Sequence, residues 1–377
     1  MQTASTPATL LASIELSKST WRVAIAEPGN SKVSQHCLPG GDTAGLLDLL
    51  KRLSQRAAAR LGSAVRPITV MEAGYDGFWL HRLLVANGID SYIVDPASIL
   101  VDRRARRVKT DRSDAHSLLR SLAAYLRGEA HVCTMVRVPT VEAEDLRRQV
   151  RERDRLLSER NRHTNRVKAL LFGQGIRDFD LRRPRASDRL ADLRTGDGRA
   201  LAPCLLAELR REVERLLMIE RHLKEVEAER DAVVEQRAHE SPAEARILAL
   251  CKLKGIGRTA ATVLVREAFH RDFANRRQVA SFFGLAPSPW SSGTINVEQG
   301  ISKAGSRRAR SIMVELAWLW LRWQPATRLA KWFHERTGAA RGATRKVLIT
   351  AVARRLAVDL WRYLVAGVVP EGANAAA

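Results

Sequence analysis

Cysteine is scarce in this chain, and the few cysteines stand far apart. The four are Cys37, Cys133, Cys204 and Cys251, and no CxxC pair or Cys/His cluster occurs. A structural zinc site needs such closely spaced ligands, so the sequence argues against one. Scattered single cysteines are typical of a reducing compartment.

Long hydrophobic runs are also missing. No apolar stretch reaches the roughly 18 residues of a membrane span, and the most apolar segment, AWLWLRW, is short and contains Arg322. The N-terminus lacks the basic and apolar regions of a secretory signal. We therefore expect a cytoplasmic protein with no membrane partner.

Acidic residues are heavily outnumbered by basic ones. The 377 residues include 63 Lys and Arg against 41 Asp and Glu, a net charge of +22, and 45% of the chain is hydrophobic. That length and apolar content allow two or three domains with proper cores. The basic excess favours a nucleic-acid partner, because each cation placed on a phosphate releases counterions. A basic but merely solvated surface is the alternative.

The first 130 residues alternate between strand and helix patterns. Strands are predicted at 10–16, 20–27, 32–38, 66–73 and 90–96, and helices at 43–61, 77–88 and 109–128. Three leading strands can form an antiparallel meander, to which crossovers add parallel strands. This is the order of a ribonuclease-H-like (RuvC-like) α/β domain, although another α/β sheet would fit the same pattern.

Two further regions follow the predicted domain at 1–130. Region 131–244 carries two long, highly charged helical patterns with apolar residues near heptad spacing, as in a coiled-coil arm, and a helix pair packed on its own domain fits equally well. Region 245–377 is mostly helical and includes the helix-hairpin-helix-like segment KLKGIGRTAA. The predicted fold class is therefore α/β plus α.

Four acids are placed where metal-dependent phosphodiester chemistry needs them. Glu15 and Glu72 lie at the ends of predicted strands, and Asp111 and Asp114 lie three apart near a helix start. Converging carboxylates can bind Mg²⁺ or Mn²⁺. Singly, each acid has an ordinary explanation, such as complementing a helix dipole. Lower-ranked acids in turns are Asp42, Asp76, Asp90, Asp95 and Asp102.

Several basic and glycine residues are candidates for DNA contact. The run beside Asp111 can hold a DNA backbone, and the glycine turn lets backbone N–H groups approach a phosphate, although a simple tight turn is the plainer explanation. The candidates are Arg103, Arg104, Arg106, Arg107, Lys109, Gly255, Gly257, Lys303, Arg307, Arg308 and Arg310.

The segment PSPWSSGT offers Ser288, Ser291 and Ser292 in what we expect to be a loop. Downstream guanidinium groups could neutralise charge if one serine attacked a phosphodiester. Serines in Pro/Gly-rich loops usually have no catalytic role, and no GxSxG motif is present. The spaced tryptophans are interpreted as core residues rather than stacking platforms: Trp318, Trp320, Trp323, Trp332 and Trp361.

Together these motifs resemble those of the insertion-sequence one-ten family of transposases, including its eleven-eleven branch of bridge-RNA-guided recombinases. The matching stretches appear in family order over nearly the whole chain: SIELSKSTW, VMEAGYDGFWL, VDPASILVDRRARRVKTDRSDA, LKGIGRTAATVL, FFGLAPSPWSSG and QGISKAGSRRAR.

The resemblance implies a RuvC-like DEDD domain at 1–130, a coiled-coil region at 131–244 and a serine transposase domain at 245–377. It makes Glu15, Glu72, Asp111 and Asp114 the metal-binding acids and Ser292 the nucleophile, with Ser291 as the neighbouring alternative. Glu15 departs from the family, which commonly has Asp there.

The resemblance also implies a mechanism and partners. The serine attacks DNA, forms a covalent link and exchanges strands between donor and target, guided by a noncoding RNA, in a homo-oligomer that is a dimer or a tetramer. Two alternatives stay open. One is a metal-dependent nuclease or Holliday-junction-resolvase-like enzyme that uses only the acids, and the other is a non-catalytic nucleic-acid-binding protein.

Overall fold

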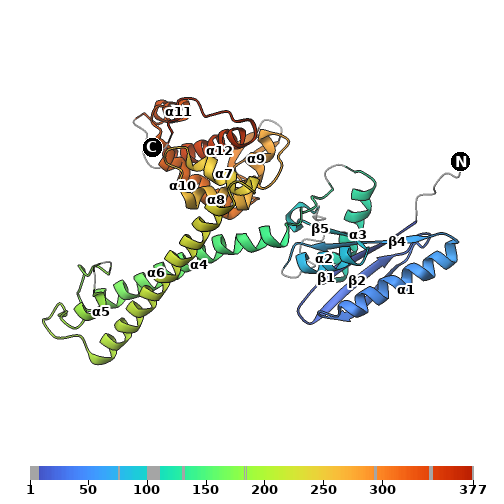
Figure 1. The fold of residues 1–377 in the computed structure, drawn as a ribbon, viewed down its shortest axis with the longest axis horizontal. Helices are drawn as coiled ribbons and strands as arrows, with labels where there is room; N and C mark the ends of the chain where they lie inside the picture. Colours follow the sequence, from blue (N-terminus) through green and yellow to red (C-terminus); the bar gives the residue numbers. More distant parts are fainter. Residues whose placement is uncertain are drawn as a thin grey trace. The chain divides into compact units, whose positions relative to one another are not determined.

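The chain folds into two compact units, residues 1–139 and 140–377, in the computed structural model (Figure 1). The structure describes residues 8–74, 77–99, 111–129, 132–181, 183, 185–292, 295–338 and 343–375. Among these residues no helix is long and apolar enough to cross a membrane.

The first unit is built on a five-stranded mixed sheet with the order β3-β2-β1-β4-β5. The first three strands pair antiparallel, whereas β4 lies parallel to β1 and β5 parallel to β4. The sequence predicted this meander followed by parallel strands, and the structure confirms it. The strands are β1 (Ala8–Leu16), β2 (Thr20–Ala26), β3 (Val33–Pro39), β4 (Val65–Glu72) and β5 (Asp90–Val94).

Helices cover both faces of this sheet. Helices α1 (Thr43–Leu61) and α2 (Gly77–Ala86) share an apolar core with Ile14 and Ile25 on one face. Helix α3 (Asp111–Leu126) packs on the other face, where its Leu118 and Leu122 join Ile68 and Val70. A sheet buried on both faces explains why β1 and β4 read as near-continuous apolar runs.

Two long helices begin the second unit. Helices α4 (Val141–Phe172) and α6 (Pro203–Arg237) run antiparallel, with the short α5 (Ala186–Arg189) in their connection. Their buried side chains form two apolar clusters, and ion pairs such as Arg153–Glu227 and Arg166–Glu208 join the two helices. These pairs show that the helices are antiparallel, because residues further along α4 pair with residues earlier in α6.

The remainder of the second unit is a cluster of shorter helices around one apolar core. Phe283, Trp320, Phe333 and Leu356 lie at its centre. The elements are α7 (Pro242–Cys251), α8 (Arg258–Leu264), a π-helical turn (Val265–Phe269), α9 (Arg276–Phe282), the hairpin β6 (Pro287–Ser292) and β7 (Ile295–Ile301), α10 (Arg307–Trp323), α11 (Arg328–Thr337) and α12 (Ala343–Ala366).

Candidate active site

Glu15 and Glu72 stand opposite each other on neighbouring strands. In the parallel pairing of β1 with β4, Ile14 is opposite Met71, so the next residues are Glu15 and Glu72. Neighbouring strands lie about 4.8 Å apart. Two carboxylates that are 57 positions apart in the sequence are therefore brought to the same end of the sheet.

Both glutamates also lie on the α3 face. Side chains alternate between faces along a strand, and Ile14 and Met71 belong to the core under α1 and α2. Glu15 and Glu72 therefore lie on the opposite face, in line with Ser13 and with Val70, which packs against α3. Glu15 is half-buried, with its Oε2 atom shielded from solvent, whereas Glu72 is exposed.

The start of α3 is fixed beside these strands. The buried Ser13 hydroxyl donates a hydrogen bond of 2.8 Å to the backbone oxygen of Ala115, across the interface between β1 and α3. Helix α3 begins at Asp111, so the backbone of Asp111 and Asp114 belongs to the same first turns. Their side chains are outside the described part of the structure.

The four predicted metal-binding residues thus come from two adjacent strand ends and one helix start. Among the side chains that the structure describes, no three His, Cys, Asp or Glu residues are grouped to hold a metal ion, and that set does not include Asp111 or Asp114. The donors are all carboxylate oxygens, the ligand type that Mg²⁺ and Mn²⁺ prefer.

Arg22 is a residue of this site that sequence reasoning missed. It pairs in register with Glu15 across the antiparallel β1–β2 ladder. Directly opposite residues of such a ladder lie on the same face, so an arginine stands beside the first acid. The sequence did mark this arginine, because Arg22 is the one charged residue of the strand TWRVAIA.

The predicted basic run lies outside the described residues. It comprises Arg103, Arg104, Arg106, Arg107 and Lys109, which directly precede α3 in the sequence, and the lower-ranked Asp76 and Asp102 are outside as well.

The predicted serine loop is a β-hairpin, and that expectation was wrong. Ser288, Ser291 and Ser292 all lie on β6, which pairs antiparallel with β7. The β-branched residues of INVEQGI favour a strand, and only Gly293 and Thr294 separate Ser292 from its partner Ile295. The serines are therefore held on a ladder and not on a free loop.

Ser291 and Ser292 differ in their hydrogen bonding. The Ser291 hydroxyl lies 3.1 Å from Oδ1 of Asn296, its cross-strand partner, and donates to it. Ser292 is exposed at the end of β6, and its hydroxyl has no hydrogen bond to any residue that the structure describes. Of the two hydroxyls, only that of Ser291 is hydrogen-bonded within the described residues.

The start of the hairpin and the segment after it are joined by backbone hydrogen bonds. Ser302 N donates to Ala286 O at 2.8 Å, and Ser306 N donates to Phe282 O at 2.9 Å. Gly305 has φ +145°, and a Cβ there would stand 2.4 Å from the oxygen of Phe282. Glycine is therefore required in the SKAG segment.

The four basic residues after the hairpin have different environments. Lys303 and Arg307 are exposed. The Arg308 guanidinium forms ion pairs with Asp154 of α4 and, at 3.3 Å, with Glu267. The Arg310 guanidinium donates to the Lys303 oxygen at 3.0 Å. Lys303 and Arg307 are thus better placed to meet a phosphate.

Gly255 and Gly257 lie in the turn between α7 and α8. Gly255 has φ +93°, and a Cβ there would stand 3.0 Å from Cβ of Trp323. Gly257 is the N-cap of α8, with open space around it. The turn thus packs against Trp323 of α10 at Gly255, whereas the space beside Gly257 is open.

The tryptophans are only partly core residues. Trp320 is buried, as predicted, but Trp318 and Trp323 are 40% and 42% exposed. Cationic groups stand over these exposed rings, with the Arg345 guanidinium 5.6 Å from Trp318 and the Arg322 guanidinium 5.2 Å from Trp323.

Comparison with known proteins gives a consistent result. Residues 13–174 match the DEDD transposase family of the IS110 group, and residues 248–331 match the family described as transposase IS116/IS110/IS902. Similar proteins include two from Sinorhizobium fredii (strain NBRC 101917 / NGR234), "Putative transposase y4rJ" and "Putative transposase y4qE". The first is 48% identical, covering 97% of this chain and 94% of that protein. The second is 30% identical, covering 77% and 73%.

A third similar protein is the transposase for insertion sequence element IS1111A of Coxiella burnetii (strain RSA 493 / Nine Mile phase I). It is 28% identical, and the match covers 65% of this chain and 63% of that protein. A DEDD domain indicates dependence on a divalent metal ion, and a transposase acts on DNA. The chain belongs to the IS116/IS110/IS902 family of transposases and is a DNA transposase.

Proposed function

We propose that this transposase cleaves and rejoins DNA through Ser292, assisted by Mg²⁺ or Mn²⁺ held by Glu15, Glu72, Asp111 and Asp114. The observation that carries the proposal is the register of β1 and β4, which places Glu15 and Glu72 side by side on the face where α3 begins. No ordinary packing role requires two carboxylates opposite each other on neighbouring strands, because their like charges repel each other.

The donor set fits a hard divalent cation. Four carboxylates from three elements offer oxygen ligands without sulfur or nitrogen, which suits Mg²⁺ or Mn²⁺ and not zinc. When bound, the ion would supply neutralisation of the charge on the phosphodiester oxygens. Glu15 is one methylene longer than the Asp common in the family, and Arg22 opposite it is placed to orient its carboxylate.

Ser292 supplies the nucleophile. Its Oγ forms a bond to phosphorus while the bond from phosphorus to one sugar oxygen breaks; the serine proton passes to water, and the released sugar oxygen takes up a proton to become a hydroxyl. Rejoining reverses these steps with a sugar hydroxyl of another strand. Lys303 and Arg307, both exposed, would neutralise the phosphate charge that develops. Arg308 and Arg310, which we also predicted to bind DNA, would act by holding this segment in place.

The functional division at 1–130, 131–244 and 245–377 accompanies this proposal. The helix pair α4–α6 would serve as a coiled-coil arm for assembly of a homo-oligomer, a dimer or a tetramer, in which the acids and Ser292 act on one phosphodiester. Gly255 and Gly257, in a helix-hairpin-helix-like element, and the basic residues 103–109 would contact the DNA backbone. A noncoding guide RNA would select the donor and target sites.

Two serine variants test the nucleophile against the resolvase-like alternative. Ser292→Ala should abolish the covalent protein–DNA adduct and strand exchange. Ser291→Ala, the matched control one residue away, should keep both, because its hydroxyl is bonded to Asn296. Normal cleavage by Ser292→Ala would instead support an enzyme that uses only the acids.

The acids are tested separately by Asp114→Asn. This variant should bind DNA as before and lose cleavage at every Mg²⁺ or Mn²⁺ concentration. Cleavage that survives it would remove Asp114 from the metal site, and the absence of metal-dependent cleavage in the unaltered protein would leave a DNA-binding protein only.

A further inference from the structure

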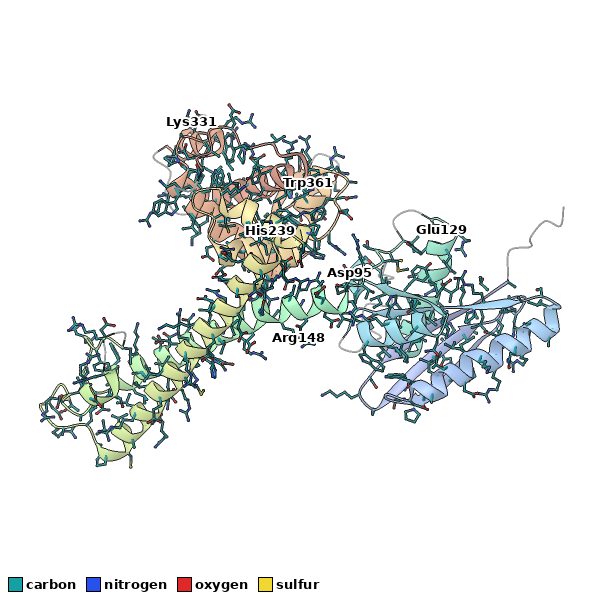
Figure 2. All side chains as sticks on the ribbon, viewed as in Figure 1. Asp95, Glu129, Arg148, His239, Lys331 and Trp361 are labelled. Atoms are coloured by element: carbon teal, nitrogen blue, oxygen red, sulfur yellow. The ribbon has the colours of Figure 1, made fainter. Side chains whose placement is uncertain are left out.

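The helical cluster of the second unit contains a large cavity that the proposed chemistry does not use. Its volume is about 1120 Å³. Its walls come from α9, α11, α12, the start of β6 and the chain that follows α12. Figure 2 draws the side chains of these helices, with Lys331 of α11 and Trp361 of α12 labelled.

The walls are strongly cationic. The lining side chains include six arginines and only two carboxylates, Asp359 and Glu371. A concave surface with one sign of charge focuses the field and attracts the opposite charge. The arginines are Arg276, Arg277, Arg328, Arg354, Arg355 and Arg362.

Four of these guanidiniums have no ion-pair partner within 4 Å among the described residues. Arg276, Arg277, Arg354 and Arg362 form no ion pair with any carboxylate that the structure describes. Arg328 pairs with Glu371 at 3.4 Å, but both side chains are about three-quarters exposed. The cavity thus holds several cations without partners, which is the condition for binding a polyanion.

Arg355 packs against an aromatic ring within this group. Its guanidinium lies 3.9 Å from the centre of the Trp332 ring. Burial lowers the pKa of Arg355, and the charges of Arg354, Arg336 and Arg328 lower it further. Burial also raises the pKa of Asp359, although it faces Arg362, Arg328 and Arg355. One partly desolvated carboxyl is a weak counterion for so many arginines.

The remaining walls are apolar. Leu329, Val358, Pro287 and Trp332 line the cavity beside the arginines, and the Arg355 and Arg336 guanidiniums stand over the Trp332 ring. A simple phosphate or sulfate site would not need such apolar surface. Guanidiniums, which bind phosphates and can stack on bases, together with apolar surface, suit a single-stranded nucleic acid.

The cavity has the dimensions of a site for a small ligand, at about 1120 Å³. A few unpaired nucleotides fit within it. The cavity also adjoins the serine hairpin, because Pro287 lines the cavity and begins the strand that ends at Ser292. Five residue steps of a strand span about 17 Å.

We propose that this cavity binds a short unpaired segment of the DNA strand that Ser292 cleaves, with phosphates on the arginines and a base against the apolar wall. The inference rests on the proposed function, because only cleavage at Ser292 makes this strand the cut strand. It assigns this part of the second unit the task of holding the strand next to the break.

Binding of the full-length protein to a fluorescent single-stranded oligonucleotide tests the inference, with Ser292→Ala as background so that no cleavage intervenes. The double variant Arg276→Gln/Arg362→Gln removes two unpaired cations. Each lost phosphate contact lowers the salt slope of single-strand binding by about 0.7, so the slope should fall by about 1.4. The affinity for a duplex of the same sequence should change little.

The control double variant is Arg210→Gln/Arg211→Gln, which removes two exposed arginines from α6. It should leave the slope for single strands unchanged. Trp332→Leu should weaken single-strand binding severalfold, because it removes the ring against which the Arg355 guanidinium packs.

An unchanged slope in the Arg276/Arg362 variant would overturn the inference, as would equal losses for duplex and single strand. A larger loss for RNA of the same sequence than for DNA would also overturn it. These results are independent of the nucleophile: an unmodified Ser292 in cleavage reactions would refute the proposed function, while the loss of single-strand affinity would still identify a DNA-strand site.

Discussion

The hydrogen bond between Ser13 and Ala115 leads to a test of how the acidic site is built. We predict that Ser13→Ala leaves the first unit folded but raises the metal concentration needed for DNA cleavage. Ser13 is fully buried, and its hydroxyl ties β1 to the first turns of α3. Glu15 stands two residues further on β1, and Asp111 and Asp114 stand on the tethered helix.

The magnitudes follow from the geometry. A net hydrogen bond contributes about 0.5–1.5 kcal/mol, and the Ala115 oxygen keeps its helical hydrogen bond, so we expect a loss of about 1 kcal/mol or less in the free energy of unfolding. The effect on metal binding should be larger, because loss of a group that orients metal ligands typically lowers affinity by about 10–100-fold. The half-maximal Mg²⁺ or Mn²⁺ concentration should therefore rise at least about tenfold.

The assay is cleavage of a donor DNA as a function of metal concentration, with urea unfolding in parallel. Ser54→Ala is the matched control, because Ser54 is equally small, is buried on α1, and its hydroxyl has no hydrogen-bond partner among the described residues. Ser54→Ala should change neither the metal concentration needed for cleavage nor the free energy of unfolding appreciably. The reasoning is refuted if Ser13→Ala and Ser54→Ala show the same metal requirement.

Two further predictions concern the second unit. Gly255→Ala should lower the free energy of unfolding by about 1–3 kcal/mol, because alanine is strained at φ +93° and its Cβ would press on Trp323, whereas Gly257→Ala, with open space, should cost much less. Glu244→Gln should cost about 3–5 kcal/mol, because it leaves the buried Arg266 without a counterion 3.6 Å away. Urea unfolding monitored by circular dichroism checks both. A Gly257→Ala variant as unstable as Gly255→Ala, or a Glu244→Gln variant as stable as the parent, would contradict them.

Much of the first unit could be predicted because its signals are local. Asp42 caps α1, with its side chain accepting from Gly45 N at 2.9 Å, and Gly62 ends the helix with φ 65°. Both residues are standard helix boundaries in the sequence, and the predicted helix 43–61 is confirmed. The mixed sheet followed from the strand order, because meanders and right-handed crossovers leave few alternatives.

The geometry of the acidic site was not readable in the same way. That Glu15 and Glu72 lie opposite each other depends on the register of a parallel strand pair, which no local residue fixes. Arg22 was overlooked because its importance comes only from the partner strand. Register is a property of the whole sheet, and a shift of one residue would reverse the face of every side chain.

The serine hairpin and the basic residues show where sequence patterns mislead. The segment PSPWSS has two prolines and no alternation of apolar residues, so it does not look like a strand, and its β structure comes from pairing with β7. Arg307 and Arg308 are neighbours of the same type, yet Arg308 is paired with Asp154 and Arg307 is exposed. Only packing distinguishes them.

The most direct test of the account is to trap the covalent protein–DNA complex on supercoiled donor DNA in the presence of Mg²⁺ or Mn²⁺ and to map the modified residue by mass spectrometry. We predict a single nucleotide adduct on Ser292, which disappears in Asp114→Asn. An adduct on Ser291 or any other residue, or efficient cleavage with no adduct at all, would contradict the central claim.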